Sequence, residues 1–205
     1  MLSKSDKAVK IREGQSLKTD SLETYIRNAM ELPKAHMEVL QFPSGYSNLT
    51  YLLKFGKKEL VLRKPPQGVK IKSGHDMDRE FRILSGLHPL YNKVPQPFLF
   101  SDELSIIGTP FYIMERMHGV IFRGHTPKDQ LPDLNQMRKL SEAFVSTLVE
   151  IHSFNYHAAG LENLGRPDGY VNRQIEGWTK RYIKAKTDEF KPLEKVYTWL
   201  NKNIP

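Results

Sequence analysis

The sequence contains no cysteine among its 205 residues, which excludes both a disulfide framework and a zinc site built on thiolates. It also has no apolar run near the roughly 20 residues that a membrane-spanning helix requires. The first residues, MLSKSDKAVKIREGQS, include basic side chains but no apolar core, so a secretory signal is not expected there. These absences favour a cytoplasmic protein without a membrane partner.

The composition, with 39% hydrophobic and 26% charged residues, is typical of a globular protein of one sizeable domain or two small lobes. A net charge of +8 predicts an anionic partner of some kind. Much of the positive charge lies in helical sequence near the C-terminus, and no recognisable nucleic-acid-binding motif accompanies it. A solvated helix face explains this charge better than a nucleic-acid groove, so a nucleic-acid partner is not expected.

Short strands are expected first and helices afterwards. Short runs rich in apolar residues predict strands at 38–42, 49–55, 59–63, 98–101 and 111–115, the last two directly after proline or glycine residues. Helical spacing predicts helices at 20–30, 73–87, 135–152 and about 172–203, the last broken near Pro192. Asp20 with Glu23, and Ser73 with Asp76, stand in capping positions of two of these helices. This order predicts an α+β fold, a small sheet lobe followed by a helical lobe.

One carboxylate of the expected helix 73–87 occupies a position where an apolar residue would be usual. Met77, Leu84 and Leu87 form one stripe of this helix, and Glu80 falls on the same stripe. A carboxylate on the packed side of a helix needs a cation or hydrogen-bond donors. Two interpretations stay open here: Glu80 has such partners, or it lies at the edge of the stripe and reaches water.

A cation for Glu80 is available in the expected strand 59–63. Leu60 and Leu62 share one face of this strand, so Arg63 projects from the other face. Arg63 can therefore form an ion pair with Glu80 on the inner side of the lobe. Beside a glycine-containing loop, such a pair makes a positively biased pocket that suits phosphate. A purely structural salt bridge between a strand and a helix is the alternative.

The loop before the strand 49–55 contains Gly45, Ser47 and Asn48. Gly45 allows a tight turn and the close approach of a ligand to the backbone. Ser47 and Asn48 add short side chains and exposed N–H groups, which can form an anion-binding concavity. A glycine–serine turn before a strand is also an ordinary hairpin connection. The loop gains significance because Arg63 and Glu80 follow it.

These residues resemble those of a known family. The segments SGYSNLTYLL, VLRKPP, HDMDREFRILSGL, GTPFYIMERMHGVIFRG and LGRPDGYVNRQIEGWTKRY are similar to the aminoglycoside phosphotransferase superfamily, which has a protein-kinase-like fold. They most resemble the branch whose kinase-like domains are sometimes fused to acyl-CoA dehydrogenases. The resemblance covers about residues 20–205.

The resemblance implies a protein-kinase-like N-terminal lobe, made of an antiparallel sheet and one helix, followed by the first helices of a helical C-terminal lobe. It implies four parts, namely an N-terminal segment and helix at 1–34, the nucleotide-binding lobe at 35–117, a hinge or linker at 118–130, and a partial helical lobe at 131–205.

The resemblance also implies the residues that bind a nucleotide. The loop 45–48 covers the ATP phosphates, and Arg63 takes the place of the strand lysine that holds the α- and β-phosphates, oriented by Glu80. The backbone carbonyl of Glu115 and the N–H of Met117 hydrogen-bond adenine at the hinge. Arginine in place of lysine departs from the aminoglycoside kinases, so the detailed phosphate contacts stay open.

The family's catalytic loop, which resembles His-Gly-Asp followed by Asn, has no counterpart in this sequence, because none of the 7 histidines begins it. The resemblance implies ATP and magnesium as cofactors, with the magnesium ligands and the catalytic aspartate outside this chain. No catalytic or metal-binding residue is therefore assigned. The chain is expected to be the front portion of a larger kinase-like protein and inactive alone, with the remaining C-terminal kinase portion as its partner.

Three functions stay open. The leading one is the nucleotide-binding portion of an ATP-dependent small-molecule phosphotransferase that acts on a hydroxyl. A hydroxyacyl-CoA is a reasonable acceptor, and an aminoglycoside a weaker one. The second is a non-catalytic nucleotide-binding or protein-interaction module, which fits the missing loop. The third, a basic nucleic-acid binder, rests on charge alone.

Overall fold

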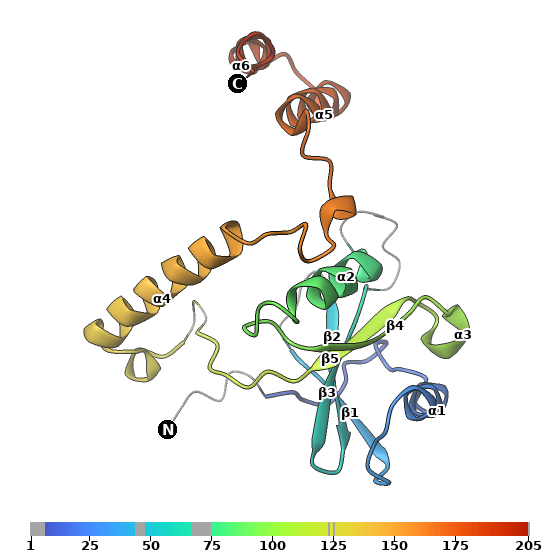
Figure 1. The fold of residues 1–205 in the computed structure, drawn as a ribbon. Coiled ribbons are helices and arrows are strands. Elements are labelled where there is room, and N and C mark those ends of the chain that lie inside the picture. Colours follow the sequence, from blue (N-terminus) through green and yellow to red (C-terminus); the bar gives the residue numbers. More distant parts are fainter. Residues whose placement is uncertain (1–6, 44–47, 67–74, 123, 125, 205) are drawn as a thin grey trace. The chain divides into compact units, whose positions relative to one another are not determined.

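The computed structural model describes residues 7–43, 48–66, 75–122, 124 and 126–204. The chain forms two compact units, Met1–Leu161 and Glu162–Pro205. The first unit contains the sheet, and the described part of the second consists mainly of two helices (Figure 1).

Five short strands form one antiparallel sheet in the first unit (Figure 1). Their order is β1-β2-β3-β5-β4, so β5 lies between β3 and β4. The strands are β1 (Met37–Gln41), β2 (Leu49–Phe55), β3 (Lys58–Lys64), β4 (Pro97–Ser101) and β5 (Phe111–Glu115). Every predicted strand is present, with its ends within one residue of the predicted ones.

The turn between β2 and β3 sets the register around the candidate site. Gly56 and Lys57 make a two-residue connection, and Gly56 has a φ of 62°, which glycine adopts without strain. In the resulting register Thr50 of β2 lies opposite Arg63 of β3, and Arg63 lies opposite Tyr112 of β5. Thr50, Arg63 and Tyr112 therefore form a row on one face of the sheet.

The other face of the sheet packs against α1 (Thr19–Ala29). Leu22 and Ile26 of this helix are fully buried in one cluster with Tyr51 and Leu62 of the sheet. Full burial of a large aliphatic side chain contributes about 1.5–3 kcal/mol. Because side chains alternate along a strand, burial of Leu62 on this face directs the next residue of β3 to the opposite face.

Helix α2 (Met77–Leu87) covers the face of the sheet that carries Arg63. It contacts β4 and β5. The ring of Phe81 packs against Phe100 and Tyr112, with centroid separations of 5.8 and 6.3 Å. This packing places the first turn of α2 above the row of residues that contains Arg63.

The other helices are α3 (Leu104–Ile107) and α4 (Leu134–His152) in the first unit and α5 (Tyr170–Ala185) and α6 (Lys191–Lys202) in the second. Helix α4 begins at a capping box, in which Asp133 and Gln136 satisfy each other's backbone N–H groups. Single 3₁₀ turns occur at Lys128–Gln130 and Glu162–Leu164. Within the described ranges, no helix combines the length and hydropathy needed to cross a membrane.

The predicted capping pair of α1 was wrong. Asp20 lies inside the helix, and the cap residue Lys18 makes no side-chain cap hydrogen bond. Glu23 instead forms a salt bridge with Arg27 at 2.7 Å and accepts a hydrogen bond of 3.3 Å from the backbone N–H of Met37. Glu23 therefore fastens α1 to the start of β1 rather than closing the helix end.

Two further helix boundaries differ from the prediction. Helix α2 begins at Met77 rather than at Ser73, which lies outside the described residues. Asp76 is its cap, because its carboxylate accepts the backbone N–H of the third helical residue. The helix break was predicted near Pro192, but it lies earlier, at 186–190. Pro192 lies in the first turn of the new helix, a position that suits proline.

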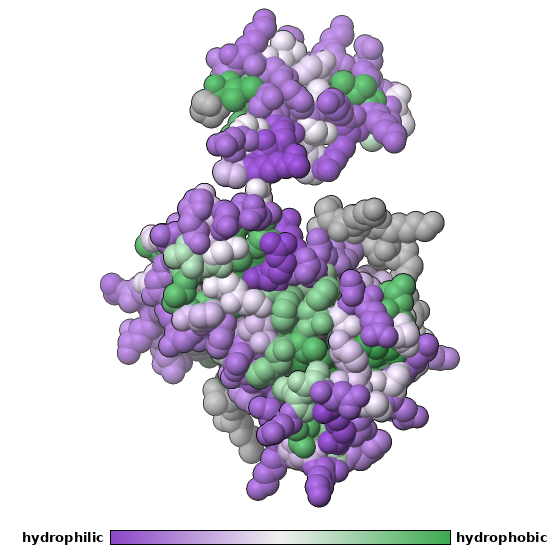
Figure 2. Space-filling model, turned by 45° about the vertical axis from the view of Figure 1, so that its right-hand side comes forward, coloured by the Kyte–Doolittle hydropathy of each residue, from purple (hydrophilic) through white to green (hydrophobic). Residues whose placement is uncertain are grey.

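The visible surface is mostly hydrophilic, with hydrophobic residues gathered in separate patches (Figure 2). The apolar stripe predicted for α4 is present, but it lies at the surface of the first unit, where Phe144 is 71% exposed. Phe122 and Leu131 line an open cavity of about 610 Å³ together with this helix. The core around Leu22 and Ile26 is thus separate from the apolar face of α4.

Candidate functional site

Arg63 and Glu80 form the ion pair that the sequence predicts. Nε of Arg63 lies 2.9 Å from Oε2 of Glu80 and joins β3 to α2, with the two side chains 34% and 31% exposed. The Nε atom itself is buried, yet its N–H is not directed well enough at an acceptor to count as a hydrogen bond among the described residues. The contact is therefore mainly electrostatic. Its burial is intermediate between that of a surface ion pair and that of a fully buried one.

Both oxygens of Glu80 have hydrogen-bond donors. The hydroxyl of Tyr112 donates to Oε2 over 2.9 Å, and the side-chain amide of Asn48 donates to Oε1 over 2.8 Å. Of the two interpretations of Glu80, the structure supports the first, because a cation and two donors meet the carboxylate on the packed side of α2.

The side chain of Asn48 is engaged inside the first unit. Asn48 is 4% exposed, and its Oδ1 lies 2.6 Å from Nδ1 of His75. Because an amide oxygen only accepts hydrogen bonds, Nδ1 of His75 is the donor. The side-chain amide of Asn48 is therefore bound at both ends, by Glu80 and by His75.

Gly45 and Ser47 lie outside the described residues, so Asn48 is the described end of the predicted phosphate loop. Before the loop, the N–H of Phe42 donates to the carbonyl of Thr50 over 3.0 Å. Asn48 directly precedes β2. Both flanks of the loop are therefore anchored at the end of β2 that lies beside Arg63.

Strand β5 leads into the predicted adenine-binding segment. The N–H of Glu115 donates to the carbonyl of Gln96 over 2.8 Å, and the Glu115 carboxylate accepts the N–H of Gln96 over 3.1 Å. Met117 is 46% exposed, and within the parts of the chain that the structure describes its N–H makes no hydrogen bond. The guanidinium of Arg116 lies 4.7 Å from the ring centroid of Phe42. The Arg116 side chain thus reaches from the predicted hinge to the residue that follows β1.

Two residues of this network escaped the sequence analysis. Tyr112 falls in a predicted strand, but only the strand order shows that it lies opposite Arg63. A usable signal was strand parity, which places Tyr112 on the face opposite the buried Phe111. His75 precedes α2 in the chain, and its partner Asn48 is 27 positions earlier, beyond the reach of a local pattern.

Comparison with known families identifies the family of the chain. The profile of the phosphotransferase enzyme family matches residues 38–205, which include the sheet, the ion pair and the helices after the predicted hinge. The chain belongs to the phosphotransferase enzyme family. The kinase-like α+β fold expected from the resemblance is thereby confirmed.

Known relatives of this phosphotransferase-family chain are much longer. It is 35% identical over 198 residues to mouse "Acyl-CoA dehydrogenase family member 10", covering 95% of this chain and 18% of the relative. It is 35% identical over 191 residues to human "Acyl-CoA dehydrogenase family member 11", covering 90% and 24%. The chain thus spans about a fifth to a quarter of these curated relatives.

A solved structure supports the same assignment. The crystal structure of a "putative aminoglycoside phosphotransferase" from Ralstonia eutropha superposes with a TM-score of 0.75 and 28% identity. The match covers 93% of this chain and 54% of the other. The fold of this family member therefore extends through its helical sequence as well as its sheet.

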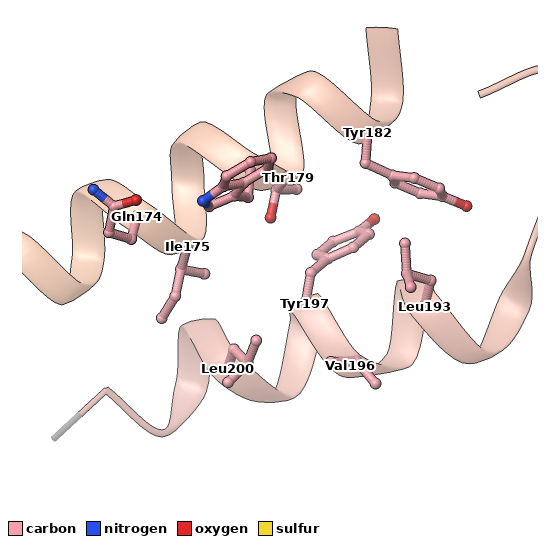
Figure 3. A pocket seen from close by; sticks show the side chains of 9 residues that line it. Gln174, Ile175, Thr179, Tyr182, Leu193, Val196, Tyr197 and Leu200 are labelled. Atoms are coloured by element: carbon pink, nitrogen blue, oxygen red, sulfur yellow. The ribbon is translucent and has the colours of Figure 1, made fainter. Parts of the chain in front are cut away.

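The second unit of this family member has a pocket of its own, between α5 and α6 (Figure 3). The pocket has a volume of about 270 Å³. Ile175 and Tyr182 of α5 face Leu193, Tyr197 and Leu200 of α6 across it. Its walls are almost entirely apolar, and none of the predicted nucleotide-binding residues lines it.

Proposed function

We propose that this chain is the nucleotide-binding portion of an ATP-dependent small-molecule phosphotransferase that transfers phosphate to a hydroxyl. One observation carries the proposal. In a chain of the phosphotransferase family, Arg63, Glu80 and Asn48 meet where the predicted phosphate loop leads into β2.

Arg63 supplies the positive charge for the nucleotide phosphates. Its Nε faces Glu80, and its terminal nitrogens make no hydrogen bond to the described residues. A guanidinium presents several donors in one plane, which match two phosphate oxygens at once. The backbone of the loop 45–48 would add N–H donors to the same phosphates.

Adenine would bind at the segment that follows β5. The N–H of Met117 would donate to the base, and the carbonyl of Glu115 would accept from it. Such backbone contacts explain why the side chains at these two positions need no special chemistry. The contact of Arg116 with Phe42 supports this placement, because it links the hinge to the residues that precede the phosphate loop through a side chain.

Magnesium would accompany ATP, as in kinase-like phosphotransferases, and would neutralise the charge that develops during transfer. The described residues fit the phosphates but not the metal, because no three His, Asp or Glu side chains among them are grouped closely enough to hold an ion. We infer that magnesium would be held by the Asn of the family's His-Gly-Asp loop and by an Asp on a later strand, while the Asp of the loop would orient the acceptor. This sequence does not contain that loop. Alone, the chain would bind nucleotide without transferring phosphate.

A hydroxyacyl-CoA is the proposed acceptor. The support comes from the relatives, whose names describe them as acyl-CoA dehydrogenase family members. A phosphotransferase portion joined to such an enzyme would act on a related thioester that carries a hydroxyl. An aminoglycoside is the weaker alternative, supported by the name of the Ralstonia protein.

A second function has one observation in its favour. Because no histidine of this sequence begins the catalytic-loop motif, the chain also suits a non-catalytic nucleotide-binding or interaction module. Joining the chain to a segment that contains a His-Gly-Asp loop separates the two functions. Hydroxyl-dependent consumption of ATP by the joined protein supports the phosphotransferase, and nucleotide binding without consumption supports the module.

Nucleotide titration tests the proposed site. Arg63→Ala should weaken ATP binding by about tenfold to a hundredfold, the value of a hydrogen bond to a charged group, and leave adenosine binding unchanged. Gly45→Val should also weaken ATP more than adenosine. Lys54→Ala is a matched control, because Lys54 forms a salt bridge of 3.3 Å with Glu38 in the same sheet, away from the site. Equal losses for ATP and adenosine in Arg63→Ala would contradict the phosphate site.

A further inference from the structure

Glu80 is held by groups from three separate places in the first unit. Arg63 reaches it from β3, Tyr112 from β5, and Asn48 from the residue that precedes β2. Residues 48 and 112 are each 32 positions away from Glu80 in the chain. A strand–helix salt bridge needs only the arginine, so the two neutral donors call for an explanation of their own.

Tyr112 acts on the oxygen that Arg63 approaches. Its hydroxyl and Nε of Arg63 both lie 2.9 Å from Oε2 of Glu80. Tyr112 is 3% exposed, and its ring is fixed by contact with Phe81 of α2. Burial, together with the negative charge of Glu80, raises the pKa of Tyr112, and Arg63 opposes this only in part. The phenol therefore remains a donor at any physiological pH.

Asn48 acts on the other oxygen. Its amide nitrogen donates to Oε1, and its amide oxygen accepts from His75, so the direction of the amide is determined at both ends. With one donor on each oxygen, the Glu80 carboxylate cannot rotate about its last bond without losing a hydrogen bond. Because Asn48 directly precedes β2, the start of this strand and Arg63 are held by the same carboxylate.

We propose that Tyr112 and Asn48, the latter anchored by His75, are positioning residues for nucleotide binding. They fix the two oxygens of Glu80 and thereby the direction in which Arg63 presents its guanidinium to a phosphate. Supporting groups that orient a charged binding residue are a recurrent requirement of precise sites. The inference rests on the proposed function, since it assigns Arg63 to a nucleotide phosphate.

Tyr112→Phe removes the hydroxyl and keeps the ring that packs on Phe81. We expect ATP to bind about threefold to tenfold more weakly and the affinity for adenosine to stay unchanged. A change of this size is typical of the energetic coupling between a supporting residue and a binding site. Tyr51→Phe is the matched control, because Tyr51 is fully buried in the same sheet and its hydroxyl donates to the carbonyl of Gln15 over 2.8 Å. Both variants lose one buried hydrogen bond, but only Tyr112→Phe should affect ATP.

A double-variant cycle shows whether Tyr112 acts through Arg63. In an Arg63→Ala background, Tyr112→Phe should have no further effect on ATP affinity. Asn48→Asp, which sets a carboxylate against Glu80, should also weaken ATP in the wild-type background and have little effect in the Arg63→Ala background. The positioning role would be overturned if Tyr112→Phe and Tyr51→Phe lowered ATP affinity equally. It would also be overturned if Tyr112→Phe lowered ATP affinity as much in the Arg63→Ala background as in the wild-type background.

A second readout does not need nucleotide. Exchange of the Arg63 Nε–H with solvent, followed by NMR, should be about threefold to tenfold faster in Tyr112→Phe and unchanged in Tyr51→Phe. If the wild-type chain binds no ATP but this acceleration is seen, the nucleotide assignment fails while the orientation of Arg63 by Tyr112 holds. Unchanged exchange in Tyr112→Phe overturns the inference even where ATP binds.

Discussion

Gly86 of α2 lies so close to Ala159 that an added Cβ would be 2.5 Å from the Ala159 carbonyl oxygen. The same Cβ would be 2.7 Å from a methyl carbon of Leu161. The segment that follows α4 thus passes directly against the back of the helix that carries Glu80. Glycine at this position allows a close approach that no other residue would permit.

Gly86→Ala should therefore destabilise the protein, although alanine in a helix is ordinarily favoured over glycine by about 1 kcal/mol. The carbonyl of Ala159 belongs to the backbone, so relieving the overlap requires the segment to move. Gly177→Ala in α5 is the control, because outside its chain neighbours and the nearby backbone of α5 no heavy atom lies within 4 Å of its added Cβ, and it should raise helix stability. Thermal unfolding followed by circular dichroism gives both values. An increase in stability for Gly86→Ala would show that the segment does not pack there.

Glu80→Gln should lower the free energy of unfolding by roughly 1–3 kcal/mol. The variant keeps the shape of Glu80 but leaves the partly buried charge of Arg63 unpaired. The expected cost therefore lies between the cost of breaking an exposed ion pair and that of breaking a buried one. Asp78→Asn is a close control in the same helical turn, because Asp78 pairs with Arg82 at 3.8 Å with both side chains about half exposed. Its cost should be below about 1 kcal/mol. Urea denaturation of both variants measures the difference, and equal costs would contradict the special environment of Glu80.

Glu23 should make stability depend on pH in the acid range. Burial alone raises the pKa of Glu23, but hydrogen bonds from Arg27 and Met37 and the charges of His36 and Arg27 outweigh it and lower the pKa below 4.5. A carboxylate whose pKa is lower in the folded state than in the unfolded state stabilises the folded protein at pH values above its unfolded-state pKa. This stabilisation is lost as the pH falls through its folded-state pKa. Glu23→Gln should therefore reduce stability near pH 7 and flatten the fall in stability below about pH 4.5. An unchanged acid slope in denaturation curves would refute this.

The 205-residue chain should show no phosphotransfer of its own. Positioning and charge stabilisation dominate phosphoryl transfer, and kinases reach about 1–100 s⁻¹ only with their metal ligands and acceptor-orienting aspartate in place. The measurement is ADP release with ATP, magnesium and a hydroxyacyl-CoA. Arg63→Ala serves as the control for a contaminating kinase. Turnover at kinase rates that disappears in Arg63→Ala would refute the prediction.

Much of the first unit could be predicted because its signals are local. Apolar runs within five short segments identified the strands that the structure describes, and parity alone directed Arg63 away from the apolar face that Leu62 occupies. Helical spacing singled out Glu80 as a carboxylate among apolar neighbours. The same local logic failed at Asp20 and Glu23, because a spacing that suits a cap says nothing of the backbone N–H of Met37 that competes for the carboxylate.

The sequence by itself determined the α+β order of elements, the family, and the two charges of the candidate site, because period, parity and motif act over a few neighbouring residues. The tertiary structure decided that β5 lies beside β3, and this placement brings Tyr112 to Glu80. It also decided that Asn48 turns its side chain inward to Glu80 and His75. These contacts join residues about 30 positions apart, so they depend on how strands are ordered and helices packed, which no local pattern encodes.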